Sequence, residues 1–175
     1  MPKRVLIVLA AAAATLALAA CGSSSKAPGV ELAPSSGATQ ASIPTTPTIP
    51  PSLAKKPVVT VPSGSPPKTL VTKDLITGTG KTATAGSTIT VNYVGVLYKT
   101  GKEFDSSWSR NQPFTTALSA SAVIPGWVQG IAGMKVGGRR ELIIPPSLAY
   151  KAAGSPPTIP GNATLIFVVD LLSVS

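Results

Sequence analysis

All eight aromatic residues of this 175-residue chain lie between Tyr93 and Phe167. Because aromatic side chains supply much of the apolar area that a domain buries, a core has to form in the C-terminal part of the chain. Residues 21–67 contain no aromatic side chain and are rich in Pro, Ser, Thr and Gly. Such a segment buries too little apolar surface to offset the entropy of ordering it. The sequence therefore predicts one folded domain over 68–175, preceded by a disordered linker over 21–67.

Residues 1–20 differ in composition from both the linker and the domain. Lys3 and Arg4 precede an Ala/Leu-rich stretch that ends in Leu-Ala-Ala-Cys at 18–21. A positive start followed by an apolar stretch too short to span a bilayer predicts a signal peptide over 1–20. The LAAC sequence resembles the lipobox of bacterial lipoproteins, whose Cys accepts a diacylglyceryl group. We expect an acylated Cys21, with palmitate as a typical chain, and an extracytoplasmic domain anchored to the bacterial cell membrane. The alternative is a secretory signal with an incidental Cys.

The composition excludes several chemistries. The chain has no His, which excludes Ser-His-Asp and Cys-His catalysis and His-ligated zinc. A single Cys excludes an intramolecular disulfide. The net charge is +9, but no block of like charge exceeds Arg139-Arg140, so nucleic-acid binding is not indicated. We therefore expect neither a metal nor a cofactor, and no nucleic-acid partner.

Strand patterns and one short helical pattern occupy the domain. Alternating or β-branched-rich runs predict strands at 69–76, 88–98, 102–106, 139–144 and 164–172. Pro125 fits the first position of a helix over 125–132, and Trp127, Val128 and Ile131 fall on one face of it. The fold class predicted is α+β, an antiparallel sheet with one face packed on a short helix.

Two enzymatic alternatives are weaker. Glu103 and Asp105 would share one face of a strand, as a two-carboxylate glycosidase requires, but nothing else indicates a sugar cleft. The Gly-rich run at 136–139 has no following Gly-Lys-Ser/Thr and is not a phosphate loop. The composition instead favours an apolar, aromatic pocket with few polar groups, which is typical of a binding site.

Six segments of the domain resemble one known family, the FKBP-type peptidyl-prolyl cis-trans isomerases. They are GKEFDSS (101–107), RNQPF (110–114), VIPGW (123–127), GIAGMKVG (130–137), IPPSLAY (144–150) and IPGNATLIF (159–167). The segments occur in the family's order and cover essentially all of 68–175. The resemblance implies a twisted antiparallel sheet wrapped around one short helix.

The resemblance also implies a site. The residues that would take part in catalysis are Tyr93, Asp105, Tyr150 and Phe167. Those that would bind substrate are Phe104, Arg110, Phe114, Val123, Ile124, Trp127 and Ile159. Trp127 would form the pocket floor, and the Tyr150 hydroxyl and the Ile124 N–H would bind a carbonyl. Four positions depart from the family's frequent choices and put substrate preference and inhibitor affinity in doubt: Ala122, Lys151, Ser155 and Thr158.

The implied activity is isomerisation of X–Pro bonds in exported or envelope proteins by a monomer. An apolar pocket would bind the twisted amide better than the planar one, without cofactor or metal. Its partners would be Pro-containing segments, the membrane through the lipid anchor, and a macrolide inhibitor. The alternative is a membrane-tethered binding module or chaperone that captures Pro-containing segments with little catalysis.

Overall fold

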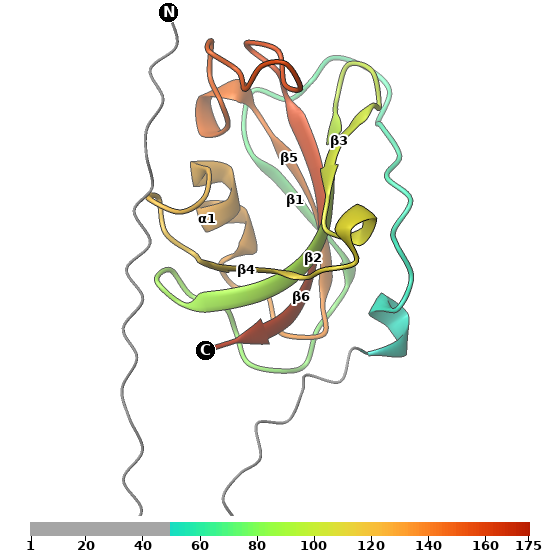
Figure 1. The fold of residues 1–175 in the computed structure, drawn as a ribbon, viewed down its shortest axis with the longest axis vertical. Helices are drawn as coiled ribbons and strands as arrows, with labels where there is room; N and C mark the ends of the chain where they lie inside the picture. The colour runs from blue at the N-terminus through green and yellow to red at the C-terminus, as the bar shows by residue number, and fades with distance from the viewer. Residues whose placement is uncertain (1–49) are drawn as a thin grey trace, which may run out of the picture. The chain divides into compact units, whose positions relative to one another are not determined.

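The computed structural model describes residues 50–175, which form a six-stranded antiparallel sheet and one short helix (Figure 1). The strands are β1 (Val71–Ile76), β2 (Thr88–Leu97), β3 (Glu103–Ser106), β4 (Phe114–Ala117), β5 (Arg139–Ile144) and β6 (Leu165–Val174). The helix is α1 (Pro125–Ile131), and the 3₁₀ turns are η1 (Pro51–Leu53), η2 (Trp108–Arg110) and η3 (Pro146–Leu148). The expected signal peptide, Cys21 and the first part of the linker lie outside the described residues.

The strand order is β1-β5-β6-β2-β3, and β4 pairs with the other half of β2. The α+β fold class and the expected strands and helix are confirmed, with ends that move by one or two residues. The one strand that the sequence did not indicate is β4. Its four residues, Phe-Thr-Thr-Ala, are too few to show an alternation, and pairing with β2 defines the strand.

Helix α1 packs closely against one face of the sheet because two of its residues are glycines. A Cβ on Gly126 would lie 2.3 Å from Cγ2 of Ile144, and a Cβ on Gly130 would lie 2.7 Å from Cδ2 of Leu142. Both contacts are shorter than real Cβ atoms allow, so any larger residue would push the helix off β5. The close approach buries Trp127 and makes the α1 face of the sheet the main core.

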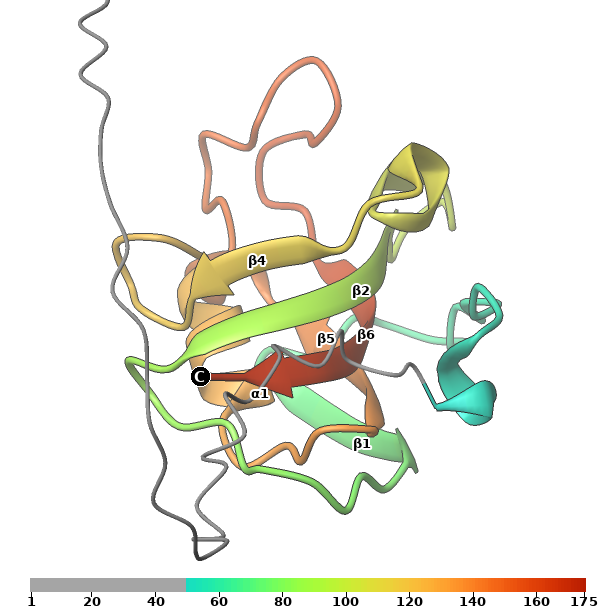
Figure 2. The same cartoon turned by 60° about the horizontal axis from the view of Figure 1, so that its bottom comes forward.

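The opposite face of the sheet is covered by residues 50–61, which we call the strap. In Figure 1 the strap runs beside β3, and Figures 1 and 2 both show it on the side of the sheet away from α1. Leu53 is fully buried, and Val59 and Val61 pack against a second cluster of buried residues: Val94, Val96, Tyr98, Ile143 and Ile166. The linker expected to be disordered up to residue 67 is therefore ordered from residue 50. Apolar side chains spaced two apart, which the Pro-rich composition concealed, hold it in place.

Within residues 50–175, no helix has the length and apolar character needed to cross a bilayer.

Candidate active site

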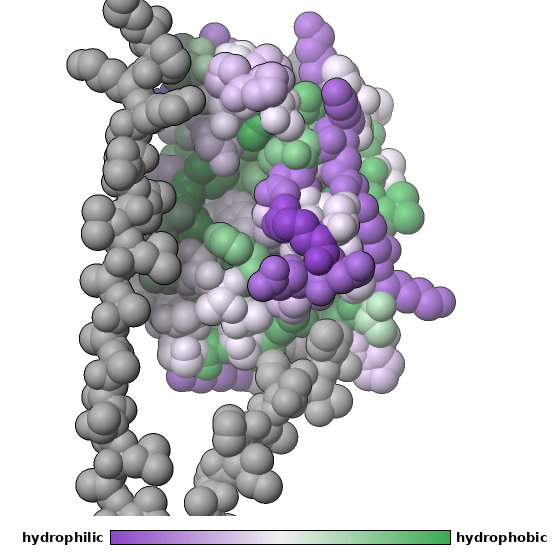
Figure 3. Space-filling model, viewed as in Figure 1, coloured by the Kyte–Doolittle hydropathy of each residue, from purple (hydrophilic) through white to green (hydrophobic). Residues whose placement is uncertain are grey.

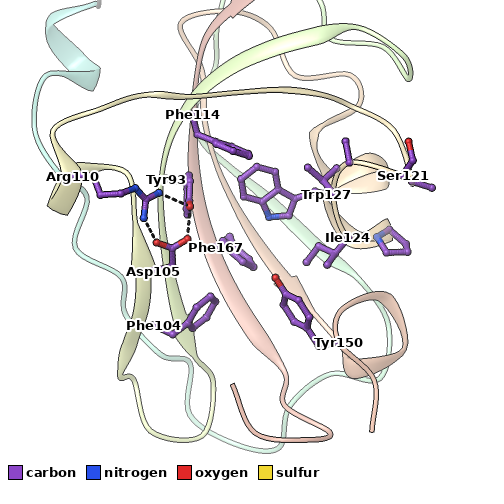
Figure 4. A pocket seen from close by; sticks show the side chains of 14 residues that line it. Tyr93, Phe104, Asp105, Arg110, Phe114, Ser121, Ile124, Trp127, Tyr150 and Phe167 are labelled. Carbon is purple, nitrogen blue, oxygen red and sulfur yellow. Dashed lines mark hydrogen bonds and ion pairs between the residues drawn. The ribbon is translucent and has the colours of Figure 1, made fainter. Parts of the chain in front are cut away.

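A cavity of about 840 Å³ opens on the α1 face of the sheet. In Figure 3 it is visible as a hollow with apolar residues at its bottom and hydrophilic residues along one edge. Side chains from five strands or turns, α1 and two loops line it, and Figure 4 shows them pointing toward one another. They are Tyr93, Phe104, Asp105, Arg110, Phe114, Ala120, Ser121, Ala122, Val123, Ile124, Pro125, Trp127, Tyr150 and Phe167.

The aromatic rings form a rigid floor and a wider rim. The ring of Trp127 meets those of Tyr93 and Phe167 edge to face, with centroids 5.2 and 5.3 Å apart. Phe104 meets Phe167 in the same way at 5.5 Å. Edge-to-face pairs stabilise one another beyond their buried area, which keeps these walls in fixed positions. Trp127 and Phe167 are each only 4% exposed, whereas the rim residue Phe114 is 37% exposed.

One edge of the cavity carries a closed polar network. The Tyr93 hydroxyl donates to one carboxylate oxygen of Asp105, and the Arg110 guanidinium donates to the other. Arg110 also donates to the Tyr93 hydroxyl oxygen over 2.8 Å, and the Ser106 N–H donates to Asp105 over 2.8 Å. Both carboxylate oxygens are thus satisfied, and three side chains from β2, β3 and η2 hold one another in place (Figure 4).

The network moves the pKa values of its members away from neutrality. Burial acts to raise the pKa of Asp105, but hydrogen bonds from Tyr93 and Arg110 outweigh it and the pKa is lowered. Burial, together with the hydrogen bond to Asp105, raises the pKa of Tyr93 to about 12. Burial and then the negative charge of Asp105 raise the pKa of Tyr150. Around pH 7 the site therefore holds one carboxylate, one guanidinium and two neutral phenols.

Three N–H or O–H donors at the cavity have no acceptor among residues 50–175. They are the hydroxyl of Tyr150, the backbone N–H of Ile124 and the buried indole N–H of Trp127. Figure 4 shows the Tyr150 hydroxyl pointing into the cavity. The Trp127 nitrogen is buried beneath the floor, whereas the Tyr150 hydroxyl and the Ile124 N–H are donors at the edge of an apolar cavity and are placed to bind a carbonyl group of a ligand. Because the walls are otherwise apolar, the site can bind a peptide group and hold it in a dry environment.

All but one of the expected site residues line this cavity. The exception is Ile159, which is buried in the main core because its loop folds inward, and Ser155 forms a bridge with it. Sequence reasoning missed Ala120, Ser121 and Pro125, which line the wall before and at the start of α1. Residues 119–122 are all Ser or Ala and show no periodicity, so their sequence carried no signal of a wall.

Of the four departures from the family's frequent choices, Ala122 lines the cavity, whereas Lys151, Ser155 and Thr158 do not.

Glu103 and Asp105 do not form a pair of free carboxylates. Glu103 binds Lys56 and Ser109 on the strap side of β3, whereas Asp105 belongs to the cavity network. A glycosidase site needs two carboxyl groups facing one bond, so this arrangement does not support that alternative. In residues 50–175 no group of three or more His, Cys, Asp or Glu is placed to hold a metal ion.

Comparison with known proteins decides the family. The sequence profile of the FKBP-type peptidyl-prolyl cis-trans isomerases matches residues 79–172. This chain belongs to that family. Relatives include an FK506-binding protein of Streptomyces anulatus, 54% identical over 122 residues, which cover 69% of this chain and 98% of the relative. An FK506-binding protein of Neisseria meningitidis serogroup A is 50% identical over 105 residues, 60% of this chain and 95% of the relative.

Solved FKBP structures agree with the fold. AtFKBP13 superposes with a TM-score of 0.57 at 37% identity, covering 61% of this chain and 93% of that one. FkpA from Escherichia coli gives a TM-score of 0.56 at 45% identity, covering 61% of this chain and 48% of that one. This isomerase therefore shares the fold of its catalytic domain with solved members of the family.

Proposed function

We propose that this FKBP-type isomerase accelerates X–Pro bond rotation in exported or envelope proteins while acylated Cys21 holds it at the membrane. The observation that carries the catalytic part is the cavity, where six of the eight aromatic side chains surround two donors, the Tyr150 hydroxyl and the Ile124 N–H, that have no acceptor among residues 50–175. The signal-peptide pattern and the lipobox at 18–21 support the location and the class of substrate.

The barrier to be lowered is that of amide resonance, about 18–20 kcal/mol. No bond is broken, so neither a nucleophile nor a cofactor is required. The twisted amide has lost its zwitterionic resonance and is less polar than the planar amide, so a dry aromatic cavity stabilises it relative to water. A rate increase of about 10³–10⁵ requires only about 4–7 kcal/mol of differential binding.

Each part of the cavity has a role in this mechanism. The ring of Trp127 is the floor on which the proline ring lies, and Phe104 and Phe167 contact the side chain before it. The Tyr150 hydroxyl and the Ile124 N–H bind substrate carbonyl oxygens and fix the orientation of the peptide. The carboxylate of Asp105, held by Tyr93 and Arg110, faces the amide at the cavity edge and disfavours the planar, zwitterionic form.

The apolar cavity also fits a macrolide of the FK506 type. Two bacterial relatives that are at least half identical over their matched lengths carry FK506-binding names. In this chain Ala122 lines the cavity, so a macrolide loses the contacts that a larger residue would supply there. We therefore expect a lowered affinity, and competition with peptide because both ligands would occupy the same cavity.

Exchange NMR on a short Leu-Pro peptide tests the activity, with the full-length chain in mild detergent and Phe167→Ala as the matched control. We expect line broadening from catalysed exchange with the wild-type chain and at least tenfold less with the variant. A well-folded chain that binds the peptide but leaves its exchange rate unchanged would identify a binding module instead.

The anchor has a separate test. Expressed in a bacterium that lipidates proteins, the chain should begin at Cys21 and its intact mass should include diacylglyceryl and acyl groups. Cys21→Ser should remain unprocessed and unlipidated, while its isomerase activity in detergent stays unchanged. A mature wild-type chain without lipid, or one beginning elsewhere, would refute the anchor and leave the isomerase assignment intact.

A further inference from the structure

We propose that the strap is a positioning element for catalysis, which holds β3 and η2 from behind so that Asp105 and Arg110 keep their places at the cavity. Each element presents one of these side chains to the cavity, and both are tied to the strap: β3 through the Glu103–Lys56 ion pair, and η2 through Ser109, which bonds the same Glu103 carboxylate. The segment that joins the domain to its N-terminal extension would thereby be part of the catalytic machinery.

The first contact is made by one carboxylate. The Lys56 ammonium on the strap donates to both oxygens of Glu103, over 3.0 and 2.8 Å. The hydroxyl of Ser109 donates to the same carboxylate over 3.1 Å. Glu103 belongs to β3 and Ser109 to η2, so this carboxylate ties the strap to both elements. Asp105 follows Glu103 by two residues, and Arg110 follows Ser109 directly.

The second contact is apolar. Strap residues alternate in exposure: Val59 and Val61 are partly buried, whereas Val58 before them is 91% exposed and Thr60 between them is also exposed. Val59 and Val61 pack against the same buried cluster as Trp108, the first residue of η2. The indole N–H of Trp108 is buried and has no hydrogen-bond partner in the described part of the chain. Packing alone therefore fixes this ring, and removing the strap side chains would loosen the apolar cluster on which it packs.

From Trp108 the connection to the site is short. The neighbouring residue, Ser107, is fully buried. Its backbone N–H donates to the Tyr93 carbonyl over 3.1 Å, and its hydroxyl oxygen accepts from the Tyr93 N–H over 2.9 Å. The Arg110 N–H donates to the Ser107 carbonyl over 3.2 Å, closing the turn. Arg110 and Tyr93 are the two side chains that bond Asp105. A displacement of η2 would therefore move Arg110 relative to Tyr93 and disturb both bonds.

The network depends on such support because its own members are poorly enclosed. The side chains of Arg110 and Asp105 are 49% and 40% exposed. Exposed ion pairs are weak by themselves, so their geometry depends on the backbone that carries them. The Streptomyces anulatus relative matches this chain over a stretch longer than residues 68–175, so the matched region includes part of 50–67. The match covers 98% of that relative, so the relative consists almost entirely of the isomerase domain and a counterpart of part of the strap.

The experiment compares matched strap variants in the full-length chain: Val59→Ser/Val61→Ser against Val58→Ser, and Lys56→Gln against Lys55→Gln. Lys55 is the control for charge because its side chain has no ion pair within residues 50–175. Values of kcat/KM are measured well below each melting temperature. We expect about a fivefold loss for the valine pair, about a twofold loss for Lys56→Gln, recovery with Lys56→Arg, and no change in either control.

A second background separates positioning from folding. In chains that also carry Asp105→Asn, the strap substitutions should lower the melting temperature as before but cause no further loss of kcat/KM, because the network they support is already broken. Unchanged kcat/KM in the first background, or an equal loss in both backgrounds, would overturn the proposal. If the valine pair fails to fold, the comparison of Lys56→Gln with Lys55→Gln decides alone, since that ion pair is exposed.

Discussion

Gly95 of β2 lies directly beneath the ring of Phe104: a Cβ atom on Gly95 would come within 2.7 Å of Cζ of Phe104. The same atom would come within 2.8 Å of Cε1 of Phe167. The position of the cavity wall formed by Phe104 and Phe167, which we propose contacts the residue before proline, thus depends on the absence of a methyl group at residue 95.

We expect Gly95→Ala to lower kcat/KM about fivefold or more by pushing these two rings into the cavity. The loss should be greatest for peptides with Leu or Phe before Pro and smallest for Ala-Pro peptides, because the rings occupy the space of the larger side chain. Ile89→Val, a buried change at the far end of β2, is the control. It should cost about 1 kcal/mol of stability without altering this preference. An identical loss for all peptides would refute this account of Gly95.

Asp105→Asn should lower kcat/KM about tenfold, which corresponds to about 1.4 kcal/mol of transition-state stabilisation. The amide keeps the shape of the side chain, but it carries no charge and has only one oxygen acceptor, so it cannot accept hydrogen bonds from both Tyr93 and Arg110. Tyr93→Phe removes one of these hydrogen bonds and should cause a smaller loss. Steady-state isomerisation assays at one temperature compare the variants. Full activity in Asp105→Asn would show that the charge at the cavity edge is not used.

Activity should be flat between about pH 6 and 8 for a peptide without ionisable side chains. The pKa of Asp105 is lowered, and the pKa values of Tyr93 and Tyr150 are raised, Tyr93 to about 12. None of these groups changes charge in that window. On the acid side, the stability that ionised Asp105 contributes is present above about pH 4 and is lost as the pH falls through its lowered pKa. A pH–rate profile with an enzyme pKa near 7 would indicate acid-base catalysis instead.

Asp170 and Arg139 form a buried ion pair across β6 and β5, with bonds of 2.5 and 2.8 Å. Asp170→Asn should lower the free energy of unfolding by about 3 kcal/mol, because it leaves the Arg139 charge without its partner. The apolar double variant Arg139→Met/Asp170→Leu should recover most of this loss, since it also removes the cost of burying two charges. Chemical denaturation of the three chains provides the comparison. A double variant as unstable as the single one would show that the pair itself stabilises the fold.

A chain that begins at residue 68 should be less stable than one that begins at residue 50. It lacks Leu53, which is fully buried, and the two inward-facing valines of the strap. Burial of these side chains stabilises the fold by about 3 kcal/mol or more, which predicts a melting temperature lower by at least about 10 °C. Thermal unfolding followed by circular dichroism measures it. Equal melting temperatures would mean that the strap does not contribute to the stability of the domain.

The sequence predicted those parts of the fold in which one side-chain pattern dominates. The alternation in β2 and the Pro-initiated pattern of α1 each appear in the structure within a few residues. Short β4 and the strap were not predicted, because β4 is defined by its pairing partner and the strap by three apolar side chains in a Pro-rich stretch. The inward fold of the loop that buries Ile159 also depends on contacts distant in sequence.

The site was predicted through family resemblance rather than through spacing. Tyr93, Asp105 and Arg110 lie on three different elements, and no periodicity relates them. Their hydrogen-bonded network arises from the β2–β3 pairing and from the left-handed residue Asn111, with φ 50°, which ends η2. A tertiary network of this kind is visible only once the strands are placed side by side.

The strap also determines where mechanical force would enter the domain. With an anchor at Cys21, we propose that a pull on the connecting chain acts on the strap, which lies on the side of the sheet away from α1, before it acts on β1. The buried side chain of Leu53 would have to leave its site, and then the Lys56–Glu103 ion pair would have to break, before tension reached β1. An isomerase tethered in this way would keep its cavity intact under drag from a bound client, up to the force that detaches the strap.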